Sequence, residues 1–429
     1  MNNHLTLSCI VIVLTIFFGL QVCLNNISGI FAQVEQRERY RNINIADSSL
    51  RFEIVAKGLK FPTGMAFLGP NDFLITEKNT GNLIRIQNGT KLENPLLTVH
   101  ISNDSERGLL GIAATDNGST PRYVFLYFTE TDSKNQSKIL GNRVYRYELV
   151  DNNSRLVNPK LLLDLPFLPG PSHDGGVLKI GPDKKTLYLV IGNLNFIQNP
   201  KYMTKAQNVK NGPPPDGRGG ILSITFDGDV VGGKGRLGDS EPLNKYYAYG
   251  LRNSFGIGFD PVTGNLWDTE NGQSMYDEIN LVKPGFNSGW GVVQGPSTLK
   301  KDFDRSKLET FDGKGAYRDP EFSWLDTVAP TSILFFGSEK LGIDYKNDLF
   351  VGSVRNGTVY HFNLNDDRTH LNLDGPLKDR LANTGGELAS VKFAKGFGTI
   401  TDLEVGPDGY LYLLSFPKHD GTLFRIVPK

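Results

Sequence analysis

Two loops in the middle of this 429-residue chain carry side chains suited to acid–base and electrostatic chemistry. His173 lies in segment 169–176, which is rich in glycine and proline and comes directly before a short apolar segment. A neutral imidazole at such a position can accept a proton from a substrate hydroxyl group near pH 7. The alternative is a turn histidine that only caps the backbone of its own loop.

The second loop, 249–256, places Arg252 and Asn253 ahead of another apolar segment. A guanidinium group presents a fixed fork of donors that suits a carboxylate or an oxygen on which negative charge develops. The alternative is a structural arginine that donates to loop carbonyl groups. Arg252 is therefore a candidate for both roles.

A third loop, 269–278, is rich in oxygen-bearing side chains and contains a glycine. Calcium prefers six to eight oxygen ligands, and loops of this kind supply them from carbonyl and carboxylate groups. Asp277 and Glu278 are either part of such a site or residues of a solvated turn.

Several other chemistries lack their sequence signatures. The chain contains no Gly-x-x-x-x-Gly-Lys-Ser/Thr loop and no Gly-x-Gly-x-x-Gly motif between a predicted strand and a predicted helix. It also has no Gly-x-Ser-x-Gly nucleophile motif and no His-Glu-x-x-His zinc motif. Lys and Arg total 46, as do Asp and Glu, so the net charge is zero. This balance argues against a general electrostatic interaction with nucleic acid.

These loops are spaced by a repeated pattern of alternating apolar strands, Pro-Asp-Gly-type turns and glycines. The first strands of its six copies contain Met65, Gly111, Val177, Ile257, Ile333 and Leu403. A period of this kind is typical of a radial β-array, so we predict an all-β six-bladed β-propeller of four-stranded antiparallel blades over residues 50–429. Segment 51–55 alternates in polarity and is expected to close the ring against the last blade. Loops of a propeller converge at one end of its central channel, which would bring the three candidate loops together.

The N-terminal segment predicts export. Residues 1–32 carry no charged side chain and are largely apolar, which indicates a signal peptide or an N-terminal membrane anchor, followed by a linker at 33–49. Both cysteines, Cys9 and Cys23, lie in this segment, so the exported part has no thiol. Six Asn-x-Ser/Thr sequences after residue 32 agree with a glycoprotein that is extracellular, periplasmic or anchored at the cell surface.

Taken in order, the loops resemble those of the soluble glucose/sorbosone dehydrogenase family, whose members are quinoproteins on a six-bladed propeller. The matching segments are 108–111, 173–176, 181–183, 252–253, 270–272, 277–281, 287–291, 327–330, 349–353 and 406–409. Each match is weak alone, and their shared order carries the resemblance.

The resemblance implies oxidation of the anomeric C–OH of an aldose to a lactone by hydride transfer to pyrroloquinoline quinone (PQQ), with Ca²⁺ as second cofactor. It implies that His173 is the general base and that Arg252 holds the quinone oxygen. The backbone carbonyls of Gly272 and Gln273 would bind the calcium ion. The remaining cofactor contacts would come from Glu106, Asn193, Asn253, Asn271, Thr327, Arg355, Thr399 and Thr401. The partners are then a small sugar, an electron acceptor and, in a homodimer, a second copy.

This chain departs from the family pattern at the cofactor. The family has Arg-x-Arg-Asp where this chain has Thr399, Ile400, Thr401 and Asp402, and both cations that would bind the quinone carboxylates are replaced. Glu106 stands where the family has glutamine, which adds a negative charge. Loss of two charge-assisted pairs costs on the order of several kcal/mol of affinity.

Two other functions therefore stay open at this point. A propeller that has lost PQQ binding would be a non-catalytic sugar-binding or interaction module. A Ca²⁺-dependent lactonase-type hydrolase would instead bring Glu106, Asn193, Asn253 and Asn271 around one ion on the axis.

Overall fold

The computed structural model describes residues 40–116, 118–150, 152–194, 199–416 and 420–429. The predicted signal peptide or anchor, residues 1–32, lies outside the described residues. The chain divides into two compact units, Met1–Asn44 and Ile45–Lys429. Within the described ranges, no helix is long and apolar enough to cross a membrane.

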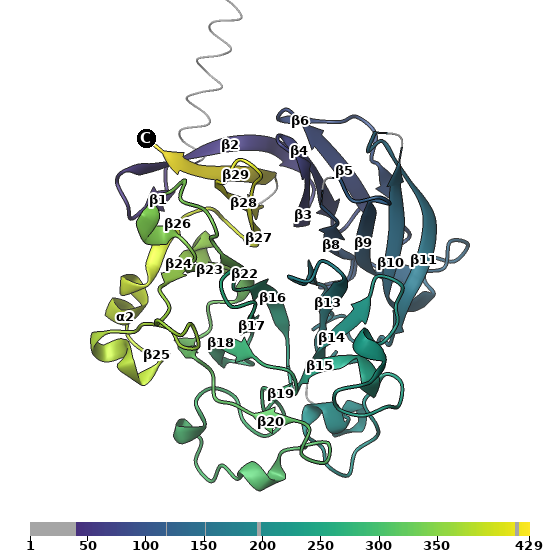
Figure 1. The fold of residues 1–429 in the computed structure, drawn as a ribbon, viewed down its shortest axis with the longest axis vertical. Coiled ribbons are helices and arrows are strands. Elements are labelled where there is room, and N and C mark those ends of the chain that lie inside the picture. The colour runs from purple at the N-terminus through teal and green to yellow at the C-terminus, as the bar shows by residue number, and fades with distance from the viewer. Residues whose placement is uncertain (1–39, 117, 151, 195–198, 417–419) are drawn as a thin grey trace, which may run out of the picture. The chain divides into compact units, whose positions relative to one another are not determined.

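The larger unit consists of strands joined in six sheets (Figure 1). Three of them, each given from its innermost strand outwards, are β3(Pro62–Gly69)-β4(Asp72–Glu77)-β5(Asn82–Gln87)-β6(Thr90–Lys91) with β7(Leu97–Thr98) also on β5; β8(Leu109–Ala114)-β9(Tyr123–Thr131)-β10(Ile139–Val150)-β11(Arg155–Leu165); and β12(Leu178–Ile180)-β13(Thr186–Ile191)-β14(Gly220–Thr225)-β15(Tyr246–Tyr249)-β19(Phe286–Asn287)-β20(Ala316–Tyr317).

The other three sheets follow the same radial plan. They are β16(Ser254–Phe259)-β17(Leu266–Glu270)-β18(Met275–Val282)-β21(Phe322–Asp326)-β25(Leu381–Ala382); β22(Pro330–Phe335)-β23(Leu349–Ser353)-β24(Val359–Phe362)-β26(Lys392–Lys395); and β27(Ile400–Val405)-β28(Leu411–Ser415)-β29(Gly421–Pro428)-β2(Leu50–Leu59). The short strand β1(Asn44–Ile45) is hydrogen-bonded to β26. Among the described residues, helices are short, such as α2(Gly385–Ser390) and the 3-10 turn η8(Arg355–Gly357).

The six inner strands form a closed ring. Contacts run from β3 to β8, β12, β16, β22 and β27 and back to β3. The predicted first strand of each repeat forms or adjoins one of these inner strands. The last sheet combines both ends of the unit, because β2 pairs antiparallel with β29, with Arg51 opposite Val427. The predicted closure by segment 51–55 is therefore confirmed.

The prediction of an all-β propeller with antiparallel sheets is confirmed, whereas the prediction of four strands in every sheet is wrong. Among the described residues, four sheets have more than four strands. In two of them the extra outer strands pair in parallel: β19 and β20 lie beyond β15, and β25 lies beyond β21. These short strands come from long connections that return to a sheet edge. They occupy its free N–H and C=O groups, which would otherwise be exposed.

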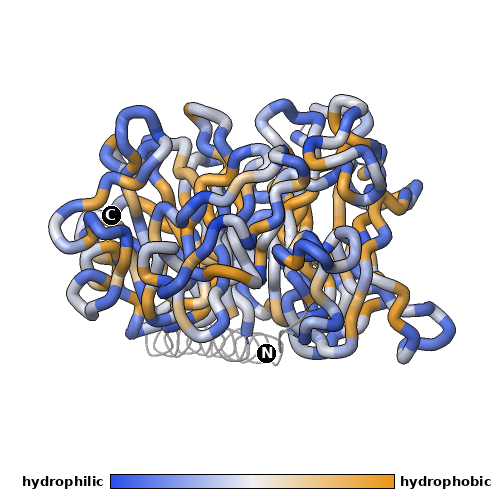
Figure 2. Tube along the Cα trace, turned by 90° about the horizontal axis from the view of Figure 1, so that it is seen from below, coloured by the Kyte–Doolittle hydropathy of each residue, from blue (hydrophilic) through white to orange (hydrophobic). Residues whose placement is uncertain are grey.

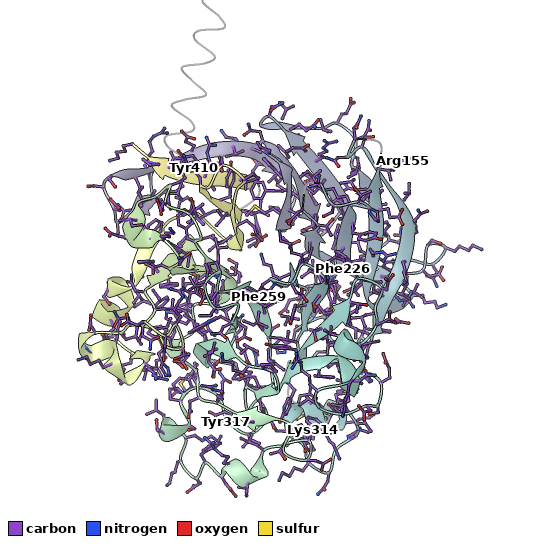
Figure 3. All side chains as sticks on the ribbon, in the orientation of Figure 1. Arg155, Phe226, Phe259, Lys314, Tyr317 and Tyr410 are labelled. Carbon is purple, nitrogen blue, oxygen red and sulfur yellow. The ribbon has the colours of Figure 1, made fainter. Side chains whose placement is uncertain are left out.

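Apolar side chains fill the space between neighbouring sheets. Hydropathy alternates along the tube, with apolar strands inside and mainly hydrophilic loops at both ends (Figure 2). In one such layer Trp267, Trp324, Phe335 and Tyr360 are buried together. All side chains are drawn in Figure 3, where the exposed residues Arg155 and Lys314 lie at the periphery. This rigid packing fixes the inner-strand ends that carry the loops.

Candidate active site

A cavity of about 320 Å³ lies where the inner strands begin. Four of the predicted cofactor contacts line it: Glu106, Asn271, Thr399 and Thr401. Much of the remaining wall is apolar and comes from Leu110, Val177, Phe255, Ala329 and Val354. The predicted convergence of loops from several sheets is therefore observed.

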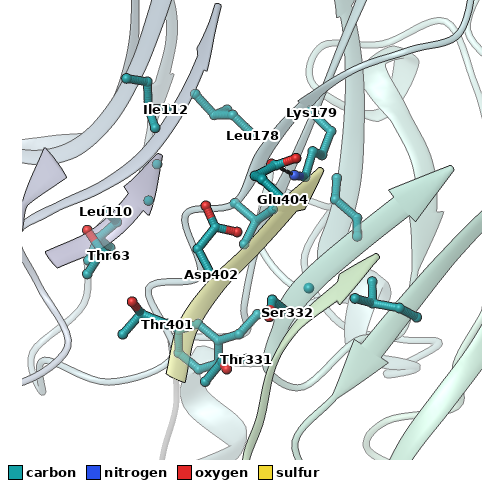
Figure 4. Close-up of a pocket in the computed structure, with 17 residues that line it drawn as sticks. Thr63, Leu110, Ile112, Leu178, Lys179, Thr331, Ser332, Thr401, Asp402 and Glu404 are labelled. Carbon is teal, nitrogen blue, oxygen red and sulfur yellow. Dashed lines mark hydrogen bonds and ion pairs between the residues drawn. The ribbon is translucent and has the colours of Figure 1, made fainter. Parts of the chain in front are cut away.

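A narrower space of about 30 Å³ continues along the axis (Figure 4). Here Lys179 forms an ion pair with Glu404, and the backbone N–H of Met65 donates to Asp402 Oδ2 over 2.9 Å. Burial raises the pKa of Asp402. These groups lie among the inner strands, so we regard them as the polar core of the ring rather than as part of the cavity.

His173 directly precedes the segment that contributes Gly175 and Gly176 to the cavity wall, and it is only 2% exposed. Its backbone N–H donates to Glu106 Oε2 over 2.7 Å, and its Nδ1 lies 2.6 Å from Asn193 Oδ1. Because an amide oxygen only accepts, Nδ1 carries the proton in this pair and Nε2 carries the ring's lone pair. The residue has a left-handed φ of 65°, which indicates a fixed, strained turn.

The electrostatics keep this imidazole neutral. Burial, followed by the positive charge of Arg252, lowers the pKa of His173 to about 4, although the Asn193 contact acts in the opposite direction. The side chain is therefore unprotonated at pH 7, as a general base requires.

Arg252 is also buried and combines both roles considered for it. Its Nη1 donates to the carbonyls of Asn271 and Gly272 over 2.9 and 3.0 Å, which is the structural role. Its Nε is buried without a hydrogen-bond partner among the described residues, so one donor is left for a ligand. The carbonyl of Arg252 accepts from the backbone N–H of Asn193 over 2.8 Å, which ties this loop to the His173 site.

Asp277 organises the calcium-binding loop predicted from the sequence. Its carboxylate accepts from the backbone N–H groups of Gly272, Val328 and Ala329 over 2.8, 2.6 and 2.7 Å. Asp277 and Glu278 are both buried, so their interpretation as a solvated turn is wrong. The carboxylate instead joins the loop after β17 to the loop before β22.

The two predicted calcium ligands lie in different surroundings. The Gly272 carbonyl faces the Arg252 guanidinium, as described above, whereas Gln273 is exposed and lines a separate surface pocket. Within the described parts of the chain, no group of three or more His, Cys, Asp or Glu side chains is placed to hold a metal ion.

The other predicted contacts surround the cavity without lining it. Asn253 is buried, its carbonyl accepts from the Asn271 N–H over 2.8 Å, and its Oδ1 has no hydrogen-bond partner within the described ranges. Arg355 is exposed in η8, next to the cavity residue Val354, and Thr327 is half-buried one residue before Val328. Asn193 contacts the His173 ring and the Arg252 carbonyl.

Lys78 is a cavity residue that the sequence analysis missed. It follows β4 directly, lines the cavity and donates to Asn79 Oδ1 over 2.8 Å. Burial lowers its pKa, while the nearby charge of Glu106 opposes that change. Its only sequence signal is a lysine at a strand end, and the closed ring is needed to place that end beside the Glu106 loop.

The structure is a closed β-propeller in which loops from several sheets surround a cavity at the end of the axis, with a buried histidine and a buried arginine nearby. The chain belongs to the glucose/sorbosone dehydrogenase family, whose family model matches residues 59–425.

Individual relatives agree with this assignment. The chain is 24% identical over 388 residues to aldose sugar dehydrogenase YliI of Escherichia coli, covering 90% of this chain and 94% of that protein. It is 26% identical over 373 residues to quinoprotein glucose dehydrogenase B of Acinetobacter calcoaceticus, covering 73% of this chain and 77% of that protein.

Solved structures also match over nearly the whole chain. The apo form of the soluble aldose sugar dehydrogenase of E. coli aligns with a TM-score of 0.67 at 25% identity, covering 89% of this chain and all of that one. The PQQ-bound aldose sugar dehydrogenase of Streptomyces coelicolor aligns with a TM-score of 0.62 at 23% identity, covering 89% of this chain and 99% of that one. This likeness supports the fold.

Proposed function

We propose that this protein is a quinone-dependent dehydrogenase that oxidises the anomeric hydroxyl group of aldose sugars to lactones, with PQQ as its cofactor. The observation that carries the proposal is the buried, neutral His173, which Asn193 and Glu106 hold beside a cavity in a chain of this family. Neither a sugar-binding module nor an interaction surface needs an imidazole kept unprotonated in this way.

The residues around the cavity suit a flat anionic quinone in part. Lys78 supplies a cation in the wall, Arg252 has a buried donor without a partner, and Thr399 and Thr401 add hydroxyl groups. The carboxylate of Glu106, which lies in the same wall, would repel an anionic ligand. Lys78 and Arg252 would therefore hold the acidic groups of the cofactor, with weaker binding than a wall with two more arginines would give.

The protein's own part in the reaction is proton removal and orientation. PQQ, when bound, supplies the hydride acceptor, because the redox chemistry belongs to the cofactor. His173 accepts the proton of the anomeric hydroxyl at Nε2, and the Nδ1–H···Oδ1 contact with Asn193 stabilises the imidazolium that forms. The positive charge of Arg252 favours an oxygen on which negative charge develops.

Calcium fits the present loop conformation less well than PQQ does. The Gly272 carbonyl already accepts from the Arg252 cation, and a metal ion on the same oxygen would be repelled by it. Titration of PQQ with and without Ca²⁺ measures whether the ion is required.

Three further features are part of the proposal. One blade is assigned to each of the six sheets, because one inner strand of each lines the axial space. The uncharged, apolar segment 1–32 supports export to the cell exterior or surface. A separate electron acceptor must reoxidise the cofactor after each turnover, and a homodimer is the assembly we expect.

The proposal is tested on the purified chain from residue 33 onward. PQQ is titrated by calorimetry with and without Ca²⁺, and reduction of a dye is then followed with a panel of aldoses. Saturable binding with aldose-dependent dye reduction is expected. Absence of binding at tens of micromolar PQQ would contradict the proposal and favour a non-catalytic propeller or a lactonase.

Glu106→Gln is expected to raise the affinity for PQQ about tenfold at pH 8, because one negative charge leaves the wall of an anion site. Burial, together with the charge of Asp174, raises the pKa of Glu106 to about 6. The carboxylate is therefore ionised at pH 8 and largely protonated at pH 5, so wild-type affinity should increase as the pH falls through 6. In Glu106→Gln that dependence should disappear, and calorimetry at both pH values measures it. Equal affinities for the two proteins at pH 8 would show that Glu106 does not face the bound cofactor.

A further inference from the structure

Glu270, the last residue of β17, is a buried carboxylate that contacts the Arg252 loop. Its Oε1 accepts from the backbone N–H of Arg252 over 2.6 Å, and its Oε2 accepts from the hydroxyl group of Ser288. Ser288 is also buried and comes directly after β19. Because β19 belongs to the sheet of β12 and β17 to the sheet of β16, this carboxylate joins the two sheets that carry His173 and Arg252.

A continuous chain of hydrogen bonds runs from Glu270 to the His173 ring. The N–H of Arg252 donates to Glu270, and the carbonyl of Arg252 accepts from the Asn193 N–H over 2.8 Å. The side-chain Oδ1 of Asn193 then lies 2.6 Å from His173 Nδ1. A shift of the Arg252 backbone would therefore move the group that orients the imidazole.

The same turn also holds the guanidinium group of Arg252. Its Nη1 donates to the carbonyls of Asn271 and Gly272, which follow Glu270 directly in the sequence. The guanidinium carbon lies 5.3 Å from the centre of the Trp290 ring, on the other side of the contact. Segment 270–272 therefore fixes both the backbone and the side chain of Arg252.

The surroundings of Glu270 disfavour a negative charge. Glu270 lies opposite Glu278 where β17 pairs with β18, and Asp268 is two residues earlier in the same strand. All three side chains are buried. Burial of a carboxylate beside like charges costs free energy, and such groups gather at functional sites. Packing alone would favour an apolar residue at this position, so the carboxylate indicates a role in holding the loop.

We propose that Glu270 is a positioning residue of the active site, which fixes the Arg252 backbone and through it the orientation of Asn193 and of the His173 ring. This inference rests on the proposed function and extends it to a residue outside the cavity wall. The role depends on the length and contacts of the side chain rather than on its charge. An amide of the same length forms both contacts, because its oxygen accepts from the Arg252 N–H and its NH₂ group donates to the Ser288 hydroxyl. Aspartate keeps the charge but is shorter by one CH₂ group and cannot reach both partners.

The test follows the His173 Nδ1–H in the cofactor-free protein by NMR with isotope-labelled histidine. A buried, hydrogen-bonded ring N–H exchanges slowly with water, and His173→Asn assigns its signal by removing it. The signal should persist in Glu270→Gln and exchange at least about tenfold faster in Glu270→Asp.

The loaded enzyme gives a second readout. For aldose oxidation, kcat should fall about 10²-fold in Glu270→Asp and less than about threefold in Glu270→Gln, with KM changed less than kcat. Glu321→Gln is the matched control, because Glu321 is a buried glutamate that pairs with His370 and Arg380 and not with the Arg252 loop. It should change neither the exchange rate nor kcat.

Two outcomes would overturn the proposal. One is loss of the signal in Glu270→Gln, because charge rather than contact geometry would then hold the loop, and the other is its persistence in Glu270→Asp. Should Glu270→Asp not fold, Ser288→Ala takes its place, since it removes one of the two partners, and an exchange rate as slow as that of the wild type would contradict the positioning role. If the wild-type protein oxidises no aldose, the proposed function fails, while the NMR comparison still decides whether Glu270 positions His173.

Discussion

His173→Ala is expected to lower kcat for aldose oxidation by about 10²–10⁴-fold, which is the usual contribution of a positioned general base. The imidazole is buried, neutral and held at Nδ1 by Asn193, so no neighbouring group in the cavity wall replaces it at pH 7 except the carboxylate of Glu106. Binding of PQQ should change little, since the proposed role of the ring is proton removal and not cofactor binding. Dye reduction gives kcat, and calorimetry gives cofactor affinity.

The pH dependence of the wild-type protein provides a second readout of the same role. A general base must be unprotonated, and the pKa of His173 is lowered to about 4. The rate should therefore hold from pH 7 to about 5 and fall only as the pH approaches 4. A histidine with its ordinary pKa would instead lose activity between pH 7 and 6.

Two variants separate chemistry from folding. His173→Asn keeps a residue that tolerates the left-handed φ, and it should fold as the wild type does while remaining inactive. His100→Ala changes an exposed histidine away from the cavity and should be fully active. If His173→Asn keeps more than about a third of the wild-type kcat, His173 is a turn residue and not the base.

The fold was predictable because its signal is repeated. Each copy contributes an apolar strand, a turn and a second strand, and packing between sheets requires the same pattern every time. The outer strands β19, β20 and β25 were not predictable, because each has only two residues and no periodicity. Their position depends on where a long connection returns, which is a tertiary effect.

The site was predictable at the level of loops and less so at the level of atoms. Residues His173, Arg252 and Asn193 come together as expected, through the Arg252 carbonyl and the Asn193 side chain. Lys78 carries no local signal, since a lysine at a strand end is common. Closure of the ring places this strand end beside the Glu106 loop.

Asp277→Ala is expected to destabilise the protein by about 3–5 kcal/mol and to abolish cofactor binding with it. The buried carboxylate accepts from three backbone N–H groups, and alanine would leave all three without an acceptor. Two of these amides, those of Val328 and Ala329, precede β22, and the third belongs to Gly272, whose carbonyl binds Arg252. The loss should therefore release the Arg252 loop as well as lower the free energy of unfolding.

Denaturant unfolding and PQQ calorimetry measure the two effects separately. Asp277→Asn retains one acceptor oxygen and should lose less stability than Asp277→Ala, whereas Asp326→Ala removes an exposed carboxylate from β21 and should change neither quantity. The three partners of Asp277 described above are backbone N–H groups. A variant that unfolds as the wild type does but no longer binds PQQ would therefore assign Asp277 directly to the ligand site. A variant that keeps both properties would show that the strands alone hold the loops around Gly272 and Val328, and that Asp277 does not position Arg252.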